Sequence, residues 1–387
     1  MTRPQRSDWI DVAKGVCIVL VVLWHVIMKH YLQIGWSLPV PLPGLWGGFG
    51  EILLPLRMPV FFTISGMLAA NAAQRPWRAV VRSRVAKFFY LYALWFTVHT
   101  AVLALAPDFD TLAAGGVLDV VEQLTITPTN LWYLIALAVY FVVAKSTRSL
   151  PTVAVLAPAL LLSAIASAGL LAAPGNRGQL YQNLLFFLIG LRFKPWVERW
   201  ARTATLRLFL TAAAAYLVAT LAIEAIGAQR WFGVWPVVSL IAVLAGIAGA
   251  VRLARVRRLR GPLTALGRNT LPIYVMHMPL LALMDLALRD PLSRAGPAVQ
   301  LAFAAGWPVA AAALLITVCL TLHRFLLAAR CDWLFDLPRR RTPQQPSVGD
   351  QQTRELPIVE QPTMWTPINR TARINGRGNP PNHRPKD

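Results

Sequence analysis

The chemistry available to this chain is indicated first by two basic side chains in its first apolar stretch. Lys14 and His25 are eleven residues apart, so on a helix they differ by about 20° and share one face. His25 then lies roughly 16 Å along the axis from Lys14. If Lys14 marks the cytoplasmic boundary of a membrane core about 30 Å thick, His25 lies near the midplane. A neutral imidazole there can take a proton from a hydroxyl group. The alternative is a packing histidine bonded to a backbone carbonyl.

An aspartate lies on the same stripe of this helix. Asp11 is about 40° from His25 but roughly 21 Å away along the axis, which is too far to orient the imidazole. Asp11 and Lys14 are three residues apart and can pair with each other. Any carboxylate partner of His25 must therefore come from another span.

The elements that hold these side chains are predicted from composition. Hydrophobic residues make up 56% of the 387 residues and charged residues 14%, whereas soluble domains are nearer 45–50% and about 25%. This favours one all-α integral membrane body over two or three soluble domains, and it excludes a disordered chain, a collagen and a disulfide scaffold. The three cysteines fix no framework, and we expect no disulfide.

Ten apolar stretches approach the roughly 17–25 residues that a membrane helix needs. The fourth and the sixth are short. The second contains Pro55 and Pro59 and the ninth contains Pro272, so we expect kinks that open cavities there. The ten predicted stretches are 10–31, 48–71, 85–106, 131–144, 151–173, 180–194, 206–227, 232–251, 263–288 and 298–327.

The charge distribution predicts the orientation of these spans. A net charge of +21 is also typical of nucleic-acid binders. With the N-terminus cytoplasmic, however, the inside segments carry 3, 5, 2, 5, 6 and 5 Lys or Arg residues in chain order, and the outside loops carry five in total. This alternation predicts both termini inside, with the lipid bilayer rather than nucleic acid as the partner of the basic surface.

The two ends of the chain have different compositions. The apolar run after Thr2–Arg6 is too long for a cleavable signal, so we expect the first span to be retained. Residues 338–387 hold nine prolines and little apolar content, which predicts a membrane domain over 1–337 and a disordered cytoplasmic tail over 338–387. The tail is either a solvated extension or is held to anionic lipid by Arg339–Arg341.

Five blocks of sequence resemble the membrane acyltransferase-3 family, which includes O-antigen and sugar O-acetylases. The first runs from Arg6 to His25 and has the family's aspartate, basic residue and histidine at Asp11, Lys14 and His25; lysine at 14, where other members have arginine, resembles the fucose-acetylase-like branch. Each block alone is weak, but five in the right order over about residues 6–327 are fairly specific. The later blocks are Met58–Gly66, Arg84–Lys87, Asn130–Leu134 and Leu266–His277.

The resemblance implies that an acyl group, most often acetyl, passes from cytoplasmic acyl-CoA to a hydroxyl of an envelope sugar, polysaccharide or lipid-linked glycan at the outer face of the inner membrane. No permanently bound cofactor is implied. Arg82, Arg84 and Lys87 would meet the coenzyme's phosphates together with Lys14, although the positive-inside rule accounts for them equally well. His25 would then deprotonate the acceptor, whose attack is direct or passes through an acyl-enzyme.

Four further residues are expected to contact substrate. Arg57 stands where the fucose-acetylase-like branch often has a histidine; it cannot act as a base, but it can bind an anion or stabilise an oxyanion. A snorkelling residue or a partner of Glu51 is the alternative. Trp132 and Tyr133 either stack on a sugar at the outer end or, as we favour, anchor at the interface. His277 follows the expected Pro272 kink and lines the cavity or packs.

Other chemistries find less support. His99, Glu224, Asp285 and His323 are weaker candidates, and the sequence predicts no metal site, Walker loop or dinucleotide loop. No extracytoplasmic domain is predicted, so the membrane domain either completes the transfer or hands the acyl group to a separate extracytoplasmic partner. A transporter of a small polar or anionic solute is the competing class, but no matching half-sequences are found. A scaffold or receptor leaves Lys14 and His25 unexplained.

Overall fold

The fold was analysed in a computed structural model that describes residues 8–109, 111, 116–125, 129–173 and 175–338. Every regular element in these ranges is helical, which confirms the predicted all-α class. Contacts within the chain define one body that ends at Pro338. The predicted tail, including Arg339–Arg341, lies outside the described residues apart from Pro338.

Each of the ten predicted apolar stretches corresponds to a helix. Seven segments are long and apolar enough to cross a membrane, by length and composition alone. The expected short fourth and sixth helices are present, and the fifth is also short, since all three have 15 or 16 residues. The helices are α1 (Asp8–Lys29), α3 (Leu54–Ala73), α5 (Lys87–Leu103), α7 (Trp132–Ser146), α8 (Thr152–Ser167), α9 (Arg177–Arg192), α11 (Leu206–Ala225), α12 (Val234–Arg255), α14 (Thr270–Ser293) and α15 (Pro297–Ala328).

Several shorter helices were not predicted. One of them, α13, takes up the start of the expected ninth span, so that span begins at Thr270 and not at 263. Its four arginines and exposed polar face suit a helix at a surface, and the chain turns at Asn269 before it enters the body. The additional elements are α2 (Leu42–Ile52), α4 (Trp77–Val81), α6 (Val117–Thr125), α10 (Lys194–Thr203), α13 (Arg257–Arg268), a π-turn at Arg82–Ala86 and 3₁₀ turns at Tyr31–Gln33 and Asp332–Leu334.

The prolines of the second and ninth predicted spans occupy different positions in their helices. Pro59 lies inside α3, while Pro55 lies in its first turn, directly after the break between α2 and α3. Pro272, by contrast, lies in the first turn of α14, where a missing N–H costs no helical hydrogen bond. The internal prolines of α14 are Pro279 and Pro291, so no kink at Pro272 precedes the site.

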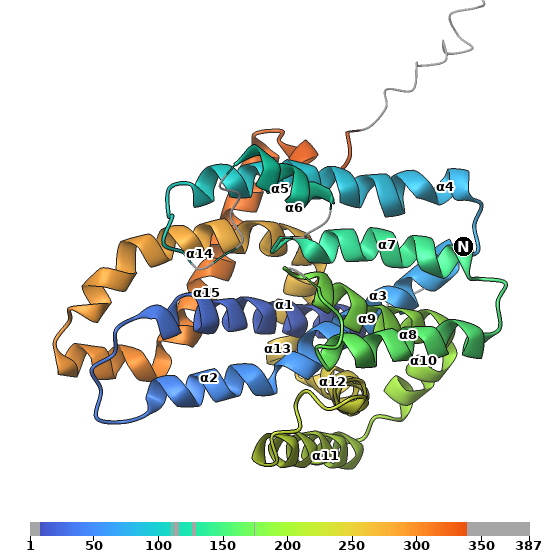
Figure 1. The fold of residues 1–387 in the computed structure, drawn as a ribbon, viewed down its shortest axis with the longest axis horizontal. Helices are drawn as coiled ribbons and strands as arrows, with labels where there is room; N and C mark the ends of the chain where they lie inside the picture. The colour runs from blue at the N-terminus through green and yellow to red at the C-terminus, as the bar shows by residue number, and fades with distance from the viewer. Residues whose placement is uncertain (1–7, 110, 112–115, 126–128, 174, 339–387) are drawn as a thin grey trace, which may run out of the picture. The chain divides into compact units, whose positions relative to one another are not determined.

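Helix α1 lies in the middle of the bundle (Figure 1), where it contacts α3, α12, α13, α14 and α15. Glycines allow its closest approach to another helix: a Cβ on Gly267 would come within 1.7 Å of the Asp11 carbonyl oxygen. The same device joins α3 to α9, where a Cβ on Gly66 would lie 1.9 Å from the Phe187 oxygen. Small residues therefore bring the helices that carry the candidate residues into backbone contact.

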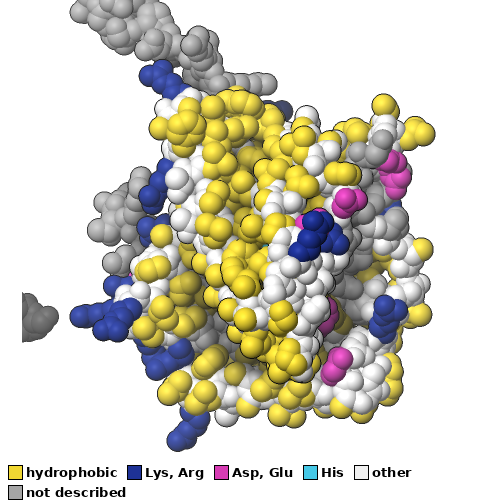
Figure 2. Space-filling view, turned by 90° about the vertical axis from the view of Figure 1, so that its left-hand side faces the viewer, with side chains coloured by type: hydrophobic (Ala, Val, Ile, Leu, Met, Phe, Trp, Pro, Cys, Tyr) yellow, Lys and Arg dark blue, Asp and Glu magenta, His cyan; other side chains and the backbone are white. Residues whose placement is uncertain are grey.

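Helix ends that the charge pattern assigns to the same membrane face contact each other or the turns beside them. On the face assigned to the cytoplasm, Lys145 Nζ donates to the Ala73 oxygen over 3.1 Å. On the opposite face, Arg289 Nε donates to the Gln33 oxygen over 3.1 Å. The face turned to the viewer in Figure 2 is covered mostly by hydrophobic side chains, as lipid contact requires. Which face is cytoplasmic stays a prediction.

Candidate active site

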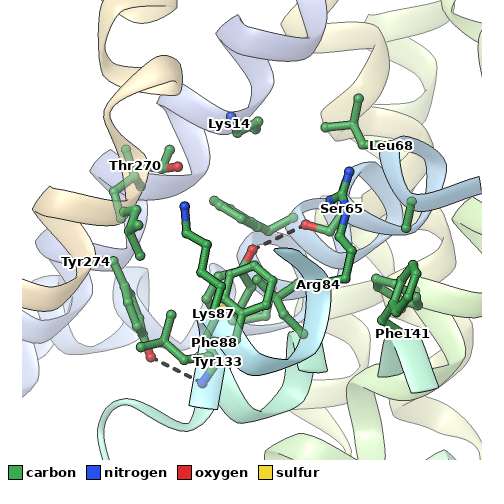
Figure 3. A pocket seen from close by; sticks show the side chains of 18 of the residues that line it. Lys14, Ser65, Leu68, Arg84, Lys87, Phe88, Tyr133, Phe141, Thr270 and Tyr274 are labelled. Atoms are coloured by element: carbon green, nitrogen blue, oxygen red, sulfur yellow. Dashed lines mark hydrogen bonds between the residues drawn. The ribbon is translucent and has the colours of Figure 1, made fainter. Parts of the chain in front are cut away.

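A cavity of about 320 Å³ lies between α1, α3, α5, α7 and α14. Three cations that the sequence predicted together, Lys14, Arg84 and Lys87, surround the same space, as Figure 3 shows. Lys14, Ile18 and Val21 line one wall at the three- and four-residue spacing of a single helix face. That face continues to His25, as its spacing from Lys14 predicted.

Asp11 contributes to the site indirectly. Its buried carboxylate lies 3.8 Å from Lys14 Nζ and 3.2 Å from Arg268 Nε, so the predicted pairing of Asp11 with Lys14 is present. Asp11 does not line the cavity. Because it bonds a cavity cation on one side and α13 on the other, Asp11 positions Lys14.

The basic residues in the π-turn and at the start of α5 do not all line the cavity. Arg84 and Lys87 line the cavity, whereas Arg82 is exposed and donates to the Pro338 carbonyl oxygen instead. Lys87 also forms an ion pair of 3.0 Å with Asp336, in the segment that follows α15. Lys14, Arg84 and Lys87 are therefore brought together, and Arg82 is not.

The first turn of α7 faces the protein interior. Trp132 is buried with its ring 5.7 Å from that of Phe62, so neither sugar stacking at the outer end nor interfacial anchoring describes it. Tyr133 lines the cavity, and its hydroxyl lies 3.2 Å from Ser65 Oγ. The Tyr133 backbone N–H donates to the Tyr274 hydroxyl over 3.2 Å. The anchor interpretation failed because neighbouring helices cover this helix end, which its sequence alone does not show.

His25 is bonded to a second histidine. His25 Nδ1 lies 2.8 Å from the Val21 carbonyl oxygen and 3.3 Å from His277 Nε2. His277 Nδ1 lies 2.7 Å from the Tyr274 carbonyl oxygen. A carbonyl accepts only from an N–H, so both neutral rings are assigned a proton on Nδ1. His277 Nε2 can then accept from His25, and the Nε2 lone pair is the basic position of His25.

This pairing corrects one expectation and decides another. The partner of His25 comes from another span, as expected, but it is an imidazole and not a carboxylate. His277 is buried and does not line the cavity, so of its two predicted roles it has the packed one, in direct contact with His25.

His25 lies one helical turn beyond the described cavity. Val21 and Tyr274, which line the cavity, accept hydrogen bonds from His25 and His277 through their carbonyl oxygens. His25 itself does not line the cavity but is only half-buried. The cavity therefore leads from three cations to the layer of residues that contacts the two histidines.

Arg57 is buried beside this pair. It is 6% exposed, so it does not snorkel, and no ion pair within 4.0 Å joins it to Glu51. Its guanidinium carbon lies 4.0 Å from the centroid of the Trp24 ring, and that ring lies 5.0 Å from His25. The structure thus places a cation near His25, where the sequence allowed an anion-binding or oxyanion role.

One buried histidine, His30, was not predicted as a candidate. His30 Nδ1 donates to Asp285 Oδ1 over 2.7 Å, and His30 Nε2 accepts from Trp307 Nε1 over 2.9 Å. The available signal was that His30 directly follows α1, which carries His25, and that Asp285 follows His277 on α14. Of the other weak candidates, His99 is buried and donates to the Val275 oxygen, while Glu224 is exposed and accepts from Gln229.

Comparison with known proteins gives two matches. The profile of the acyltransferase-3 family, described as an acyltransferase domain, matches residues 7–323. The chain is 28% identical over 360 residues to "Inner membrane protein YcfT" of Escherichia coli (strain K12), which covers 86% of this chain and 97% of that protein. No solved structure matches.

Proposed function

Because the chain belongs to the acyltransferase-3 family, we propose that this multi-pass membrane protein transfers an acyl group from acyl-CoA to a hydroxyl group, with His25 as the general base. The similarity to an inner membrane protein and the seven membrane-length segments support an inner-membrane location. The observation that carries the proposal is His25 itself, whose Nε2 holds the lone pair because its Nδ1–H donates to Val21 and His277, one turn beyond a cavity that begins at three cations.

The donor is proposed to enter at the cations. Phosphates form strong charge-assisted hydrogen bonds with Lys and Arg, and Lys14, Arg84 and Lys87 offer three such groups around one space. Beyond them the walls are mostly apolar, with the hydroxyl groups of Ser65 and Tyr133 among them. This pattern suits a pantetheine arm, an extended chain in which short carbon segments alternate with amide groups. The thioester would pass Met58, whose unbranched side chain adapts its shape.

The reaction follows from the tautomer of His25. The acceptor oxygen attacks the thioester carbonyl carbon as His25 Nε2 takes the hydroxyl proton. The new C–O bond pushes the carbonyl electron pair onto oxygen. When that pair returns, the C–S bond breaks and the thiolate of CoA takes the proton from the imidazolium of His25. His277 keeps the ring oriented throughout. The acyl group is acetyl, and the acceptor is an envelope sugar, polysaccharide or lipid-linked glycan at the outer face.

The test uses the full chain, purified and also in inverted vesicles. Labelled acetyl-CoA is supplied, release of the CoA thiol is followed, and acylated envelope glycans with and without the protein are identified by mass spectrometry. We expect transfer by the wild-type protein, loss in His25→Ala and retention in His323→Ala, a half-buried histidine of α15 that does not line the cavity. Thermal unfolding must show that both variants fold. Flux of a polar solute that survives His25→Ala, without acyl transfer, would instead identify a transporter.

A further inference from the structure

Three nitrogen donors are buried beside His25 without an acceptor. They are Nε and Nη1 of Arg57 and the indole Nε1 of Trp24, to none of which any described residue offers a hydrogen-bond acceptor. They belong to two stacked side chains, since the guanidinium lies 4.0 Å from the Trp24 ring centroid. Buried polar groups are nearly always bonded, so a cluster of this kind needs an explanation.

The neighbouring groups do not neutralise Arg57. The acidic residue that interacts with it, Glu51, is exposed and forms no ion pair with it within 4.0 Å. Another buried cation of the same protein behaves differently: Lys145 donates to the carbonyl oxygens of Ala73 and Arg75. The bundle can therefore satisfy a buried cation with backbone acceptors, and at Arg57 it does not.

The position of Arg57 relative to His25 points to a reacting group. The distances from the Trp24 ring to the guanidinium and to the imidazole are 4.0 and 5.0 Å, which limits their separation to at most about 9 Å, the sum of the two. A single acyl carbonyl fits between two groups at this separation. A hydroxyl group that is hydrogen-bonded to His25 can then attack the carbonyl carbon. Met58, next in sequence to Arg57, lines the cavity.

We propose that Arg57 and Trp24 form a site for a negatively charged oxygen next to His25. This proposal rests on the proposed acyl transfer and identifies the groups that stabilise its intermediate. Donors without acceptors, together with a positive charge, select a negatively charged oxygen. That oxygen is the carbonyl oxygen of the tetrahedral intermediate, which gains its charge as the acceptor attacks and loses it as the C–S bond breaks. A fixed carboxylate or phosphate on the acceptor has the same chemistry and is the other source that the experiment distinguishes.

The experiment compares Arg57→Met with Lys145→Met, which removes a buried cation that has partners and lies outside the proposed catalytic and binding groups. We expect Arg57→Met to keep or raise the Tm, because no bonded contact is lost, while kcat falls by about 10²–10³-fold. We expect Lys145→Met to lower the Tm and leave kcat of the folded protein unchanged. Trp24→Phe, which keeps the ring and removes one donor, should lower kcat by a smaller factor.

The kinetic constants separate the two sources of the anion. A fall in kcat with unchanged KM for both substrates identifies the oxyanion of the intermediate. A rise in the acceptor KM with unchanged kcat identifies a fixed anionic group on the acceptor. Unchanged kcat and KM values in Arg57→Met, whatever its Tm, would overturn the anion site.

A separate readout keeps this proposal distinct from the proposed function. If the wild-type protein transfers no acyl group, the proposed function fails, and the anion site is judged by thermal unfolding in sodium acetate at constant ionic strength. Stabilisation of the wild-type protein but not of Arg57→Met supports the site. Equal shifts in both proteins refute it.

Discussion

Two side-chain pairs, one on α1 and one in the turn directly after it, connect this part of the chain to α14, and they differ in how completely their polar atoms are bonded. At His25 and His277, the Nε2 lone pair of His25 has no hydrogen-bond partner among the described residues, and unpartnered donors of Arg57 and Trp24 lie beside it. At His30 and Asp285, both ring nitrogens are bonded, one to the carboxylate and one to Trp307.

The difference assigns chemistry to the pair of His25 and His277 and stability to the pair of His30 and Asp285. His30 is 0% exposed, whereas His25 is half-buried and lies one turn from the cavity. A fully bonded buried group stabilises one structure and has no capacity left for a substrate. A group with unused bonding capacity costs stability and is available for catalysis. The predictions below test this contrast in order of decreasing effect on activity.

The largest effect is expected at His25. His25→Asn removes the proposed base, so acyl transfer from labelled acetyl-CoA should fall by about 10²–10⁴-fold. The Tm should change little, because the imidazole is only half-buried and its main bond is to its own helix. A folded His25→Asn protein with wild-type kcat would remove the chemical role from this pair.

His277 is expected to come next, as a positioning residue. In His277→Phe the His25 Nδ1–H loses its second acceptor and keeps only the Val21 carbonyl oxygen, and a less firmly oriented base should lower kcat by about 10²-fold. His277→Gln keeps an acceptor and should recover part of the rate. The pH profile of kcat should shift in His277→Phe and move back in His277→Gln, a response that a merely structural role would not produce.

The cavity cations should have a smaller effect, confined to the donor. Lys14→Ala, Arg84→Ala or Lys87→Ala should each raise the KM for acyl-CoA by about tenfold and leave kcat nearly unchanged, because each removes a charge-assisted hydrogen bond. Added salt should reduce these differences. Arg82→Ala is the matched control, since Arg82 lies outside the cavity. An Arg82→Ala protein with the same loss would place the phosphates elsewhere.

The smallest effect on activity is expected at the second pair. Asp285→Ala or His30→Ala should lower the free energy of unfolding by about 1–3 kcal/mol, because each leaves a buried polar atom without its partner. The kcat of the folded protein should stay within about twofold of wild type. Thermal unfolding and kinetics on the same preparation measure both. A large loss of kcat in a stable variant would show that this pair also takes part in the reaction.

Much of the architecture was predictable from the sequence. All ten helices follow from runs of apolar residues, and the shared face of Lys14 and His25 follows from the helical repeat. Both are local properties of the chain, because hydrogen bonds within a helix join residues four apart. The start of α14 was misplaced because the second half of α13, Leu263–Gly267, holds no charged residue and leads almost directly into the apolar residues of α14.

The sequence by itself therefore determined the membrane class, the helices and the stripe that carries the proposed base. Only the tertiary structure decided that His277, 252 residues away, is the partner of His25, that Arg84 and not Arg82 lines the cavity, and that Trp132 is buried. The physical reason is that periodicity fixes which face a residue occupies on its own helix. Which helix covers that face depends on packing between segments distant in the chain, for which a single sequence holds no local signal.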